Sequence, residues 1–183
     1  TGFVLTIEKL YNEIENWQKQ FNFIPKVLNV GGGFGIRYTK DDQPIPLKNY
    51  VNDIVQTVKK ESTRLQIEVP EIWIEPGRSL VGDAGTTLYT IGSEKEIPSI
   101  RHYITVDGGM SDNLRPALYD AKYEGILANR AKEKTDGIYS IAGKCCESGD
   151  MLIWDLPLPK TNHEDMLAVV STGAYGYSMS NSY

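Results

Sequence analysis

Residues 29–36 read NVGGGFGI, three consecutive glycines with a fourth after Phe34. The run Lys26–Val30 has the composition of a short buried strand, so the glycines stand at a strand end. Glycine N–H groups are unobstructed and can approach an anion closely. The alternative is a tight strand-to-loop turn that needs positive φ angles, and this stretch alone does not separate the two.

Two common phosphate-binding motifs do not fit this loop. A dinucleotide fingerprint starting at Gly31 requires a glycine at position 36, which is isoleucine. A P-loop requires an earlier glycine and a following Ser or Thr around its Gly-Lys pair, and the pair at 143–144 has neither. In an eight-stranded α/β barrel, by contrast, phosphate sites lie on the loops after the last two strands.

The residues around the loop alternate helical and strand patterns. Residues 3–21 and 47–58 carry apolar side chains every three or four positions, which predicts two helices, the second beginning after Pro46. Residues 71–75 have the pattern of a second strand. Helix, strand, helix, strand is the order of a parallel α/β sheet. Two such units leave strand edges open, so we expect part of a larger barrel or doubly wound sheet.

The helical period ends near residue 85. Short runs rich in β-branched and aromatic residues follow and predict strands at Thr86–Ile91, His102–Val106, Gly137–Ala142, Met151–Trp154 and Met166–Ser171. Residues 132–136 have the composition of a solvated loop. The sequence therefore predicts an α/β part, 1–85, and an all-β part, 86–183, with an antiparallel sheet or barrel.

Composition limits the function. The net charge of -5, with no basic block, argues against nucleic acid or an anionic membrane as partner. No run approaches the ~18 apolar residues of a membrane span, and we expect no signal peptide. The adjacent Cys145 and Cys146 are unsuited to a disulfide, which predicts a reduced, cytoplasmic protein. Two separated histidines make no metal site, and a first residue other than Met predicts a piece of a longer chain.

Four further stretches place polar groups beside small residues: EPGRS (75–79), DGGMSDNLRPALY (107–119), CESGD (146–150) and TGAYGYSMS (172–180). A carboxylate such as Glu75 can pair with a protonated ring nitrogen, and Arg78 can bind a phosphate or carboxylate. Taken singly, EPGRS could be a strand-end turn with a surface ion pair, and Cys146 a buried inert thiol. Several such stretches in one short chain favour a site presented on loops.

In this order the five stretches resemble the diaminopimelate decarboxylases, in the alanine-racemase-like (fold type III) group of pyridoxal-phosphate enzymes, from about Val27 to Tyr183. The resemblance implies a (β/α)8 barrel that binds pyridoxal 5'-phosphate, followed by a β-sandwich or Greek-key-like domain. Residues 1–85 would be the end of an incomplete barrel, and 86–183 a β domain truncated at its C-terminal end. The implied reaction is decarboxylation of meso-2,6-diaminopimelate to L-lysine, the last step of lysine biosynthesis, in a homodimer.

The resemblance also implies roles for the cofactor residues. Gly32 and Gly33 would bind the cofactor phosphate, and Arg78 would lie close to phosphate and substrate. Glu75 would pair with the pyridine nitrogen and keep it protonated, so that the ring draws in the electrons left at Cα when CO2 departs. Tyr175 would contact both cofactor and substrate.

Four residues would bind or protonate the substrate. Arg115 and Tyr119 would hold its distal carboxylate, and Glu147 would face its distal amino group. Cys146 would return a proton to Cα, as a thiol can at neutral pH. In the family the CESGD segment comes from the neighbouring subunit. The Schiff-base lysine and the histidine that stacks on the cofactor lie in a segment absent here, so we expect this chain alone to be inactive.

Two alternatives stay open. A related decarboxylase of ornithine, arginine or carboxynorspermidine would keep the cofactor residues and change the pocket for the substrate tail. A non-catalytic homologue that regulates a partner is the third hypothesis. Such a protein would be expected to lose cofactor residues, yet Glu75, Arg78 and Cys146 are all present.

Overall fold

The computed structural model describes residues 2–183. It divides the chain into two compact units, the first made of residues up to 35 and 43–79, the second of 36–42 and 80–183. The first is α/β and the second is mostly sheet, which confirms the expected fold class. None of the helices within residues 2–183 is long and apolar enough to cross a membrane.

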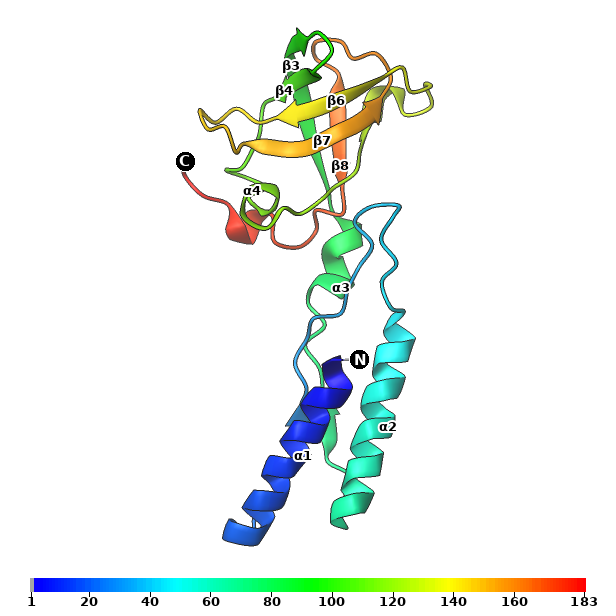
Figure 1. Ribbon diagram of the computed structural model, residues 1–183, viewed down its shortest axis with the longest axis vertical. Coiled ribbons are helices and arrows are strands. Elements are labelled where there is room, and N and C mark those ends of the chain that lie inside the picture. The colour runs from blue at the N-terminus through cyan, green and yellow to red at the C-terminus, as the bar shows by residue number, and fades with distance from the viewer. Residues whose placement is uncertain (1) are drawn as a thin grey trace. The chain divides into compact units, whose positions relative to one another are not determined.

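The first unit contains two helices and two short strands (Figure 1), namely α1 (Gly2–Phe21), β1 (Val27–Asn29), α2 (Leu47–Leu65) and β2 (Glu71–Trp73). The strands are parallel, with Leu28 opposite Ile72, as the order of elements predicts. α2 begins after Pro46 as expected but runs on to Leu65. It ends where Gln66 adopts the left-handed conformation, with φ 55°.

One apolar cluster holds the first unit together. Its buried members are Ile7, Tyr11, Ile14, Leu28, Val30, Phe34, Ile54 and Val58. The two helices are also joined by a buried hydrogen bond of 2.6 Å between the hydroxyls of Tyr11 and Ser62. Burial raises the pKa of Tyr11, so this hydroxyl stays protonated.

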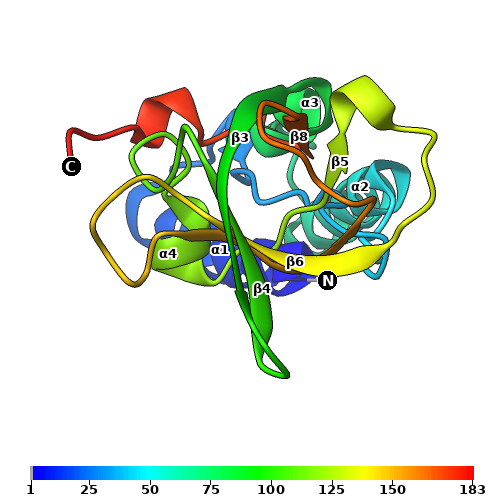
Figure 2. The ribbon, with the colours of Figure 1, turned by 90° about the horizontal axis from the view of Figure 1, so that it is seen from above.

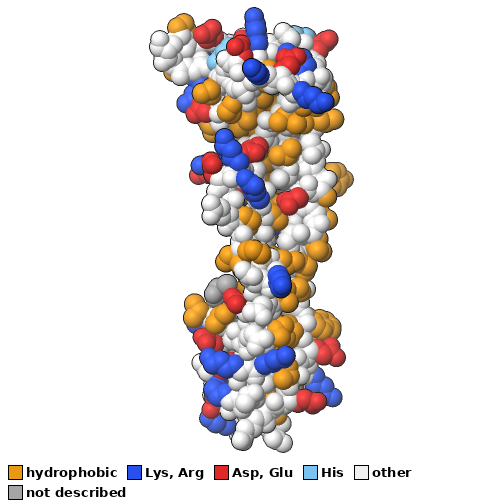
Figure 3. Space-filling view, turned by 90° about the vertical axis from the view of Figure 1, so that its right-hand side faces the viewer, with side chains coloured by type: hydrophobic (Ala, Val, Ile, Leu, Met, Phe, Trp, Pro, Cys, Tyr) orange, Lys and Arg blue, Asp and Glu red, His pale blue; other side chains and the backbone are white. Residues whose placement is uncertain are grey.

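Parts of the first unit expose apolar side chains. Trp17, Phe21 and Phe23 line an open pocket of about 500 Å³. Hydrophobic side chains also lie among charged ones on the face that carries α2 (Figure 3). In α2 itself, Leu47 and Val51 are exposed. Within residues 2–183 the outer edges of β1 and β2 have no neighbouring strand. That this unit is part of a larger α/β layer stays a prediction.

The second unit is a six-stranded sheet in the order β5-β8-β3-β4-β6-β7. The strands are β3 (Thr86–Ile97), β4 (Arg101–Val106), β5 (Gly125–Leu127), β6 (Gly137–Ala142), β7 (Met151–Leu158) and β8 (Met166–Val170). Its short helical elements are η1 (Gly82–Ala84), α4 (Arg115–Tyr119), η2 (Ala128–Arg130) and η3 (Tyr177–Met179). The helix α3 (Arg78–Val81) precedes η1.

The long strand β3 pairs with β8 through its first half and with β4 through its second. A register shift between Ile91 and Glu94 interrupts the pairing of β3 with β4. Beyond the shift, β3 and β4 form a hairpin that projects from the rest of the sheet (Figure 2). All five expected strands are present, whereas β5 and this extension of β3 were not predicted.

The expected antiparallel sheet is wrong at one pair of strands. β4 and β6 are parallel, with Tyr103 opposite Ser140, so the sheet is mixed. The long connection between them, residues 107–136, contains α4 and β5 and brings the chain back in the same direction. Parallel neighbours require a crossover of this kind.

The edges of this sheet nearly meet. A Cβ on Gly125 of β5 would lie 3.2 Å from side-chain atoms of Leu156, in β7, and of Leu167. The core inside comprises Tyr89, Ile91, Ile104, Val106, Tyr123, Leu127, Tyr139, Ile141, Leu152, Ile153, Leu156, Leu158, Leu167 and Val169. Near closure limits the unpaired edge that a six-stranded sheet would otherwise expose.

Candidate active site

The glycine loop requires its glycines. Gly31 and Gly33 have φ angles of 74° and 98°, a region that side chains disfavour. A Cβ on Gly32 would lie 2.0 Å from the carbonyl oxygen of Glu75. The Glu75 N–H donates a 2.8 Å hydrogen bond to the Gly31 carbonyl, so the loop is fixed against the end of β2. The positive φ angles therefore confirm a tight turn that needs glycine, while phosphate binding by this loop stays a prediction.

Asn29 links the glycine loop to Glu75. Its amide donates a 2.7 Å hydrogen bond to Oε1 of Glu75, and its Oδ1 accepts one of 2.9 Å from the Gly31 N–H. The carboxylate therefore lies beside the glycine loop. The next motif residue, Arg78, begins α3 and belongs to the same unit.

Arg115 is a buried cation among aromatic rings. Arg115 is the first residue of α4 and is only 8 % exposed. Its Nη1 donates a 2.7 Å hydrogen bond to the Tyr123 hydroxyl. The guanidinium carbon lies 4.8 Å from the ring centroid of Tyr38 and 5.9 Å from that of Tyr175. We call Arg115, Tyr38, Tyr123 and Tyr175 the arginine cluster.

No carboxylate within residues 2–183 forms an ion pair with Arg115. Cation–π contacts offset part of the cost of burying the charge. A buried charge is normally paired, because its desolvation costs several kcal/mol. The planar guanidinium has further N–H donors in the geometry that binds a carboxylate through two hydrogen bonds. The cluster is thus suited to an anionic ligand.

Tyr119 ends the same helix, four residues after Arg115, with its side chain 62 % exposed. It shares an element with Arg115 but is not part of the arginine cluster. Tyr175 belongs to that cluster and has a φ of 61°, in the left-handed region. Gly173, two residues earlier, packs closely, because a Cβ there would lie 1.8 Å from the Val81 carbonyl.

Cys146 and Glu147 lie on an exposed turn between β6 and β7. The Glu147 N–H donates to the Cys145 carbonyl at 2.8 Å, and the Tyr183 hydroxyl donates to the Cys146 carbonyl at 2.9 Å. Desolvation and the nearby Glu147 carboxylate raise the pKa of Tyr183, which keeps this donor protonated. Both cysteines are free thiols, as expected from their adjacency.

The structure thus groups the expected residues by unit. Gly32, Gly33 and Glu75 lie together in the first, and Arg115 and Tyr175 lie together in the second, which also carries Cys146 and Glu147. The sequence analysis missed Asn29, Tyr38 and Tyr123. Asn29 stands two residues before the first glycine, at the end of β1, so its position was a usable signal. The two tyrosines stand outside every motif, and nothing in one sequence marks them.

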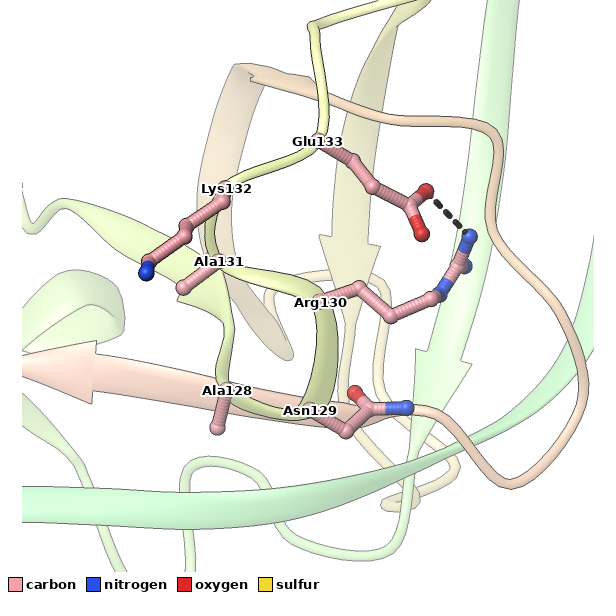
Figure 4. A pocket seen from close by; sticks show the side chains of 6 residues that line it. All are labelled: Ala128, Asn129, Arg130, Ala131, Lys132 and Glu133. Atoms are coloured by element: carbon pink, nitrogen blue, oxygen red, sulfur yellow. Dashed lines mark hydrogen bonds and ion pairs between the residues drawn. The ribbon is translucent and has the colours of Figure 1, made fainter.

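A pocket of about 410 Å³ is lined by six consecutive residues, Ala128–Glu133 (Figure 4). Arg130 pairs there with Glu133 at 2.8 Å and also with the buried Asp165. Although burial alone would raise the pKa of Asp165, hydrogen bonds from Arg130 and Asn129 lower it. The charges of Arg130, Glu133 and Asp165 are thus paired with one another. We interpret the arrangement as structural ion pairs and not as a ligand site.

The comparison with known families agrees with this geometry. Residues 10–173 match the family described as "Pyridoxal-dependent decarboxylase, C-terminal sheet domain". The chain belongs to this family. The pyridoxal-dependent decarboxylases include the fold type III enzymes that the sequence resembles, so the resemblance is confirmed.

Individual relatives are close. The diaminopimelate decarboxylase of Halalkalibacterium halodurans is 64% identical over 183 residues, which are 100% of this chain and 42% of that protein. The corresponding enzyme of Bacillus subtilis is 61% identical over 182 residues, again 100% and 42%. A crystal structure of diaminopimelate decarboxylase from M. jannaschii in co-complex with L-lysine superposes with a TM-score of 0.89. It is 34% identical, and the match covers 100% of this chain and 41% of that one. The chain thus spans about two fifths of the length of these relatives.

Proposed function

We propose that the full-length protein containing this chain decarboxylates meso-2,6-diaminopimelate to L-lysine with pyridoxal 5'-phosphate as cofactor. The observation that carries the proposal is the arginine cluster, which holds a buried guanidinium with no carboxylate partner in residues 2–183. The distal carboxylate of diaminopimelate supplies that partner. The names of the relatives and of the family support the same reaction.

The first unit fits the cofactor. Gly32 cannot gain a side chain without displacing Glu75, and the Gly31 N–H is already bonded to Asn29. Gly32 and Gly33 would hold the phosphate, with Arg78 adding positive charge near it. Glu75, oriented by Asn29, would hold the proton on the pyridine nitrogen. When bound, pyridoxal phosphate provides the electron sink for the electrons left at Cα as CO2 departs.

The second unit fits the substrate tail. Arg115 would bind the distal carboxylate through paired N–H donors, with Tyr119 and Tyr175 as further contacts. The exposed carboxylate of Glu147 would pair with the distal ammonium group. A substrate that ends in an ammonium group alone would bring a positive charge toward the Arg115 guanidinium. Arg115 and Glu147 together therefore favour a substrate whose tail carries both a carboxylate and an ammonium group.

Cys146 would donate a proton to Cα after CO2 has left. Its side chain is exposed in the single chain, and so is that of Glu147. Decarboxylation chemistry benefits from the exclusion of water, so we propose that a second subunit covers this turn in a homodimer. The two free thiols support placement of the enzyme in the reducing cytoplasm.

The direct test measures CO2 release by the full-length enzyme, loaded with pyridoxal phosphate, from meso-diaminopimelate, ornithine, lysine and arginine. We expect release from diaminopimelate only. Arg115→Ala should raise KM for diaminopimelate by about 100-fold, since it removes a charge-assisted pair worth about 2–3 kcal/mol. Equal or faster release from ornithine or arginine would assign the enzyme to a related decarboxylase. No release from any substrate, with all cofactor residues intact, would favour a non-catalytic homologue.

A further inference from the structure

Asp150, the last residue of CESGD, is a buried carboxylate with a defined set of partners. It is 3 % exposed and forms no ion pair within residues 2–183. Its Oδ1 accepts a 2.6 Å hydrogen bond from the Met110 N–H, and its Oδ2 accepts one of 2.8 Å from the Cys145 N–H. Each oxygen thus binds a different loop.

Two glycines make room for this carboxylate. A Cβ on Gly109 would lie 2.4 Å from Oδ2 of Asp150, and a Cβ on Gly143 would lie 2.1 Å from the same atom. Neither glycine has a positive φ, so no turn conformation requires glycine at these positions. Glycine is required there because the Asp150 carboxylate approaches so closely. The two loops are also joined by a 2.8 Å hydrogen bond from the Lys144 N–H to the Gly108 carbonyl.

The loops that Asp150 joins both lead to site residues. One is the turn that carries Cys146 and Glu147, whose residues 146–149 are all exposed. The other, residues 108–112, leads directly into the segment that starts α4 with Arg115. Asp150 is therefore the buried residue that holds a turn whose other residues, 146–149, are exposed in the single chain.

We propose that Asp150 is a positioning residue, which fixes the Cys146–Glu147 turn against residues 108–112 and so holds the proton donor in one place on the second unit. What Cys146 and Glu147 do rests on the function proposed above. A residue that only filled this buried position would be apolar, because burying a carboxylate is costly unless its oxygens accept hydrogen bonds. Here both oxygens are used, and each is used to hold one loop.

The variants follow from this geometry. In Asp150→Asn an amide N–H replaces one acceptor and meets a backbone N–H donor, so one loop is released. Gly143→Ala keeps the carboxylate but displaces it. Asp112→Asn is the matched control: Asp112 lies in the 108–112 loop and accepts hydrogen bonds from Gly109 and Tyr89, but it does not touch the cysteine turn.

The first readout is a double-mutant cycle on kcat in the full-length holoenzyme. A misplacement of the turn by about 1 Å corresponds to a loss on the order of 100-fold in kcat. We expect this loss in kcat from Asp150→Asn and from Gly143→Ala. In a Cys146→Ala background, Asp150→Asn and Gly143→Ala should each lower kcat less than about threefold, because their effect on kcat acts through the Cys146 side chain.

The second readout does not depend on activity. The rate at which iodoacetamide modifies Cys146 is followed by mass spectrometry of its peptide, at the alkaline plateau where the thiol is fully ionised. We expect release of the turn to raise this rate at least about fivefold in Asp150→Asn and Gly143→Ala, and Asp112→Asn to stay within about twofold.

These readouts separate the two proposals. Equal factors in the wild-type and Cys146→Ala backgrounds, or an unchanged modification rate in both variants, would overturn the role of Asp150. If Cys146→Ala alone leaves kcat intact, the proposed proton donor is wrong. The modification rates then still decide whether Asp150 holds the turn.

Discussion

Gly32→Ala tests whether the glycine loop and Glu75 act as one unit. The added Cβ would lie 2.0 Å from the Glu75 carbonyl oxygen, whereas real Cβ atoms stay at least 3.0 Å away. The loop and the strand end must therefore separate by about 1 Å. Two effects follow. The hydrogen bond from the Glu75 N–H to the Gly31 carbonyl weakens, which lowers the free energy of unfolding by about 0.5–1.5 kcal/mol. Glu75 also moves relative to the phosphate site, and a shift of this size lowers kcat/KM by about 100-fold.

The assay uses the full-length enzyme and three measurements: near-ultraviolet absorbance titration with pyridoxal phosphate, kcat/KM for diaminopimelate, and thermal unfolding. Gly35→Ala is the control in the same loop, because its nearest atom would be the Pro44 Cβ at 3.6 Å, an ordinary contact. We expect Gly32→Ala to lower cofactor affinity at least tenfold and Gly35→Ala to match the wild type. Wild-type affinity and rate in Gly32→Ala would refute the reasoning that the close approach of Glu75 fixes the site.

Three further changes test the second unit. Tyr123→Phe removes the hydroxyl that holds Arg115 and should raise KM for diaminopimelate about tenfold, for the loss of about 1.5 kcal/mol, with kcat within twofold; an unchanged KM would contradict the role of the arginine cluster. Leu167→Ala empties a fully buried position and should lower the free energy of urea unfolding by about 2–5 kcal/mol, whereas Leu88→Ala, 55 % exposed, should cost less than about 0.5 kcal/mol. Asp165 has a lowered pKa in the folded state, so its contribution is present above the unfolded-state pKa and is lost as the pH falls through the lower, folded-state value. Asp165→Asn should therefore be less stable at pH 7 and should lose less stability between pH 5 and pH 2; a wild-type pH dependence would show that Arg130 does not hold this carboxylate in the charged form.

Local patterns predicted the elements whose side chains follow a clear period. The helical spacing of Ile7, Tyr11 and Ile14 identified α1, and these are the residues buried in its core face. The second half of β3 was missed because residues 92–97 include a glycine and charged side chains and form an exposed hairpin with no apolar alternation. The parallel pairing of β4 with β6 depends on where a long connection returns, which no local pattern records.

The candidate site divides in the same way. Motif residues such as Glu75 and Cys146 stand in short stretches whose composition marks them. Tyr38 and Tyr123 are separated from Arg115 in sequence and meet it only through tertiary packing. Asp150 stood inside a quoted motif, but a carboxylate on a turn is usually solvated. Only the structure shows that it is buried, with both oxygens bonded to backbone.

The loop of residues 36–42 leaves the first unit and packs entirely in the second. There the Lys40 N–H donates to the Glu124 carboxylate at 2.6 Å, and Tyr38 stacks edge to face with Tyr123. The second unit is therefore discontinuous in sequence. Anyone who excises it for expression, or transplants it between related enzymes to exchange substrate preference, cannot use a single cut near residue 80. Such a graft would leave Tyr38 behind, and a chimaera would inherit its arginine from one parent and part of the aromatic cage around it from the other.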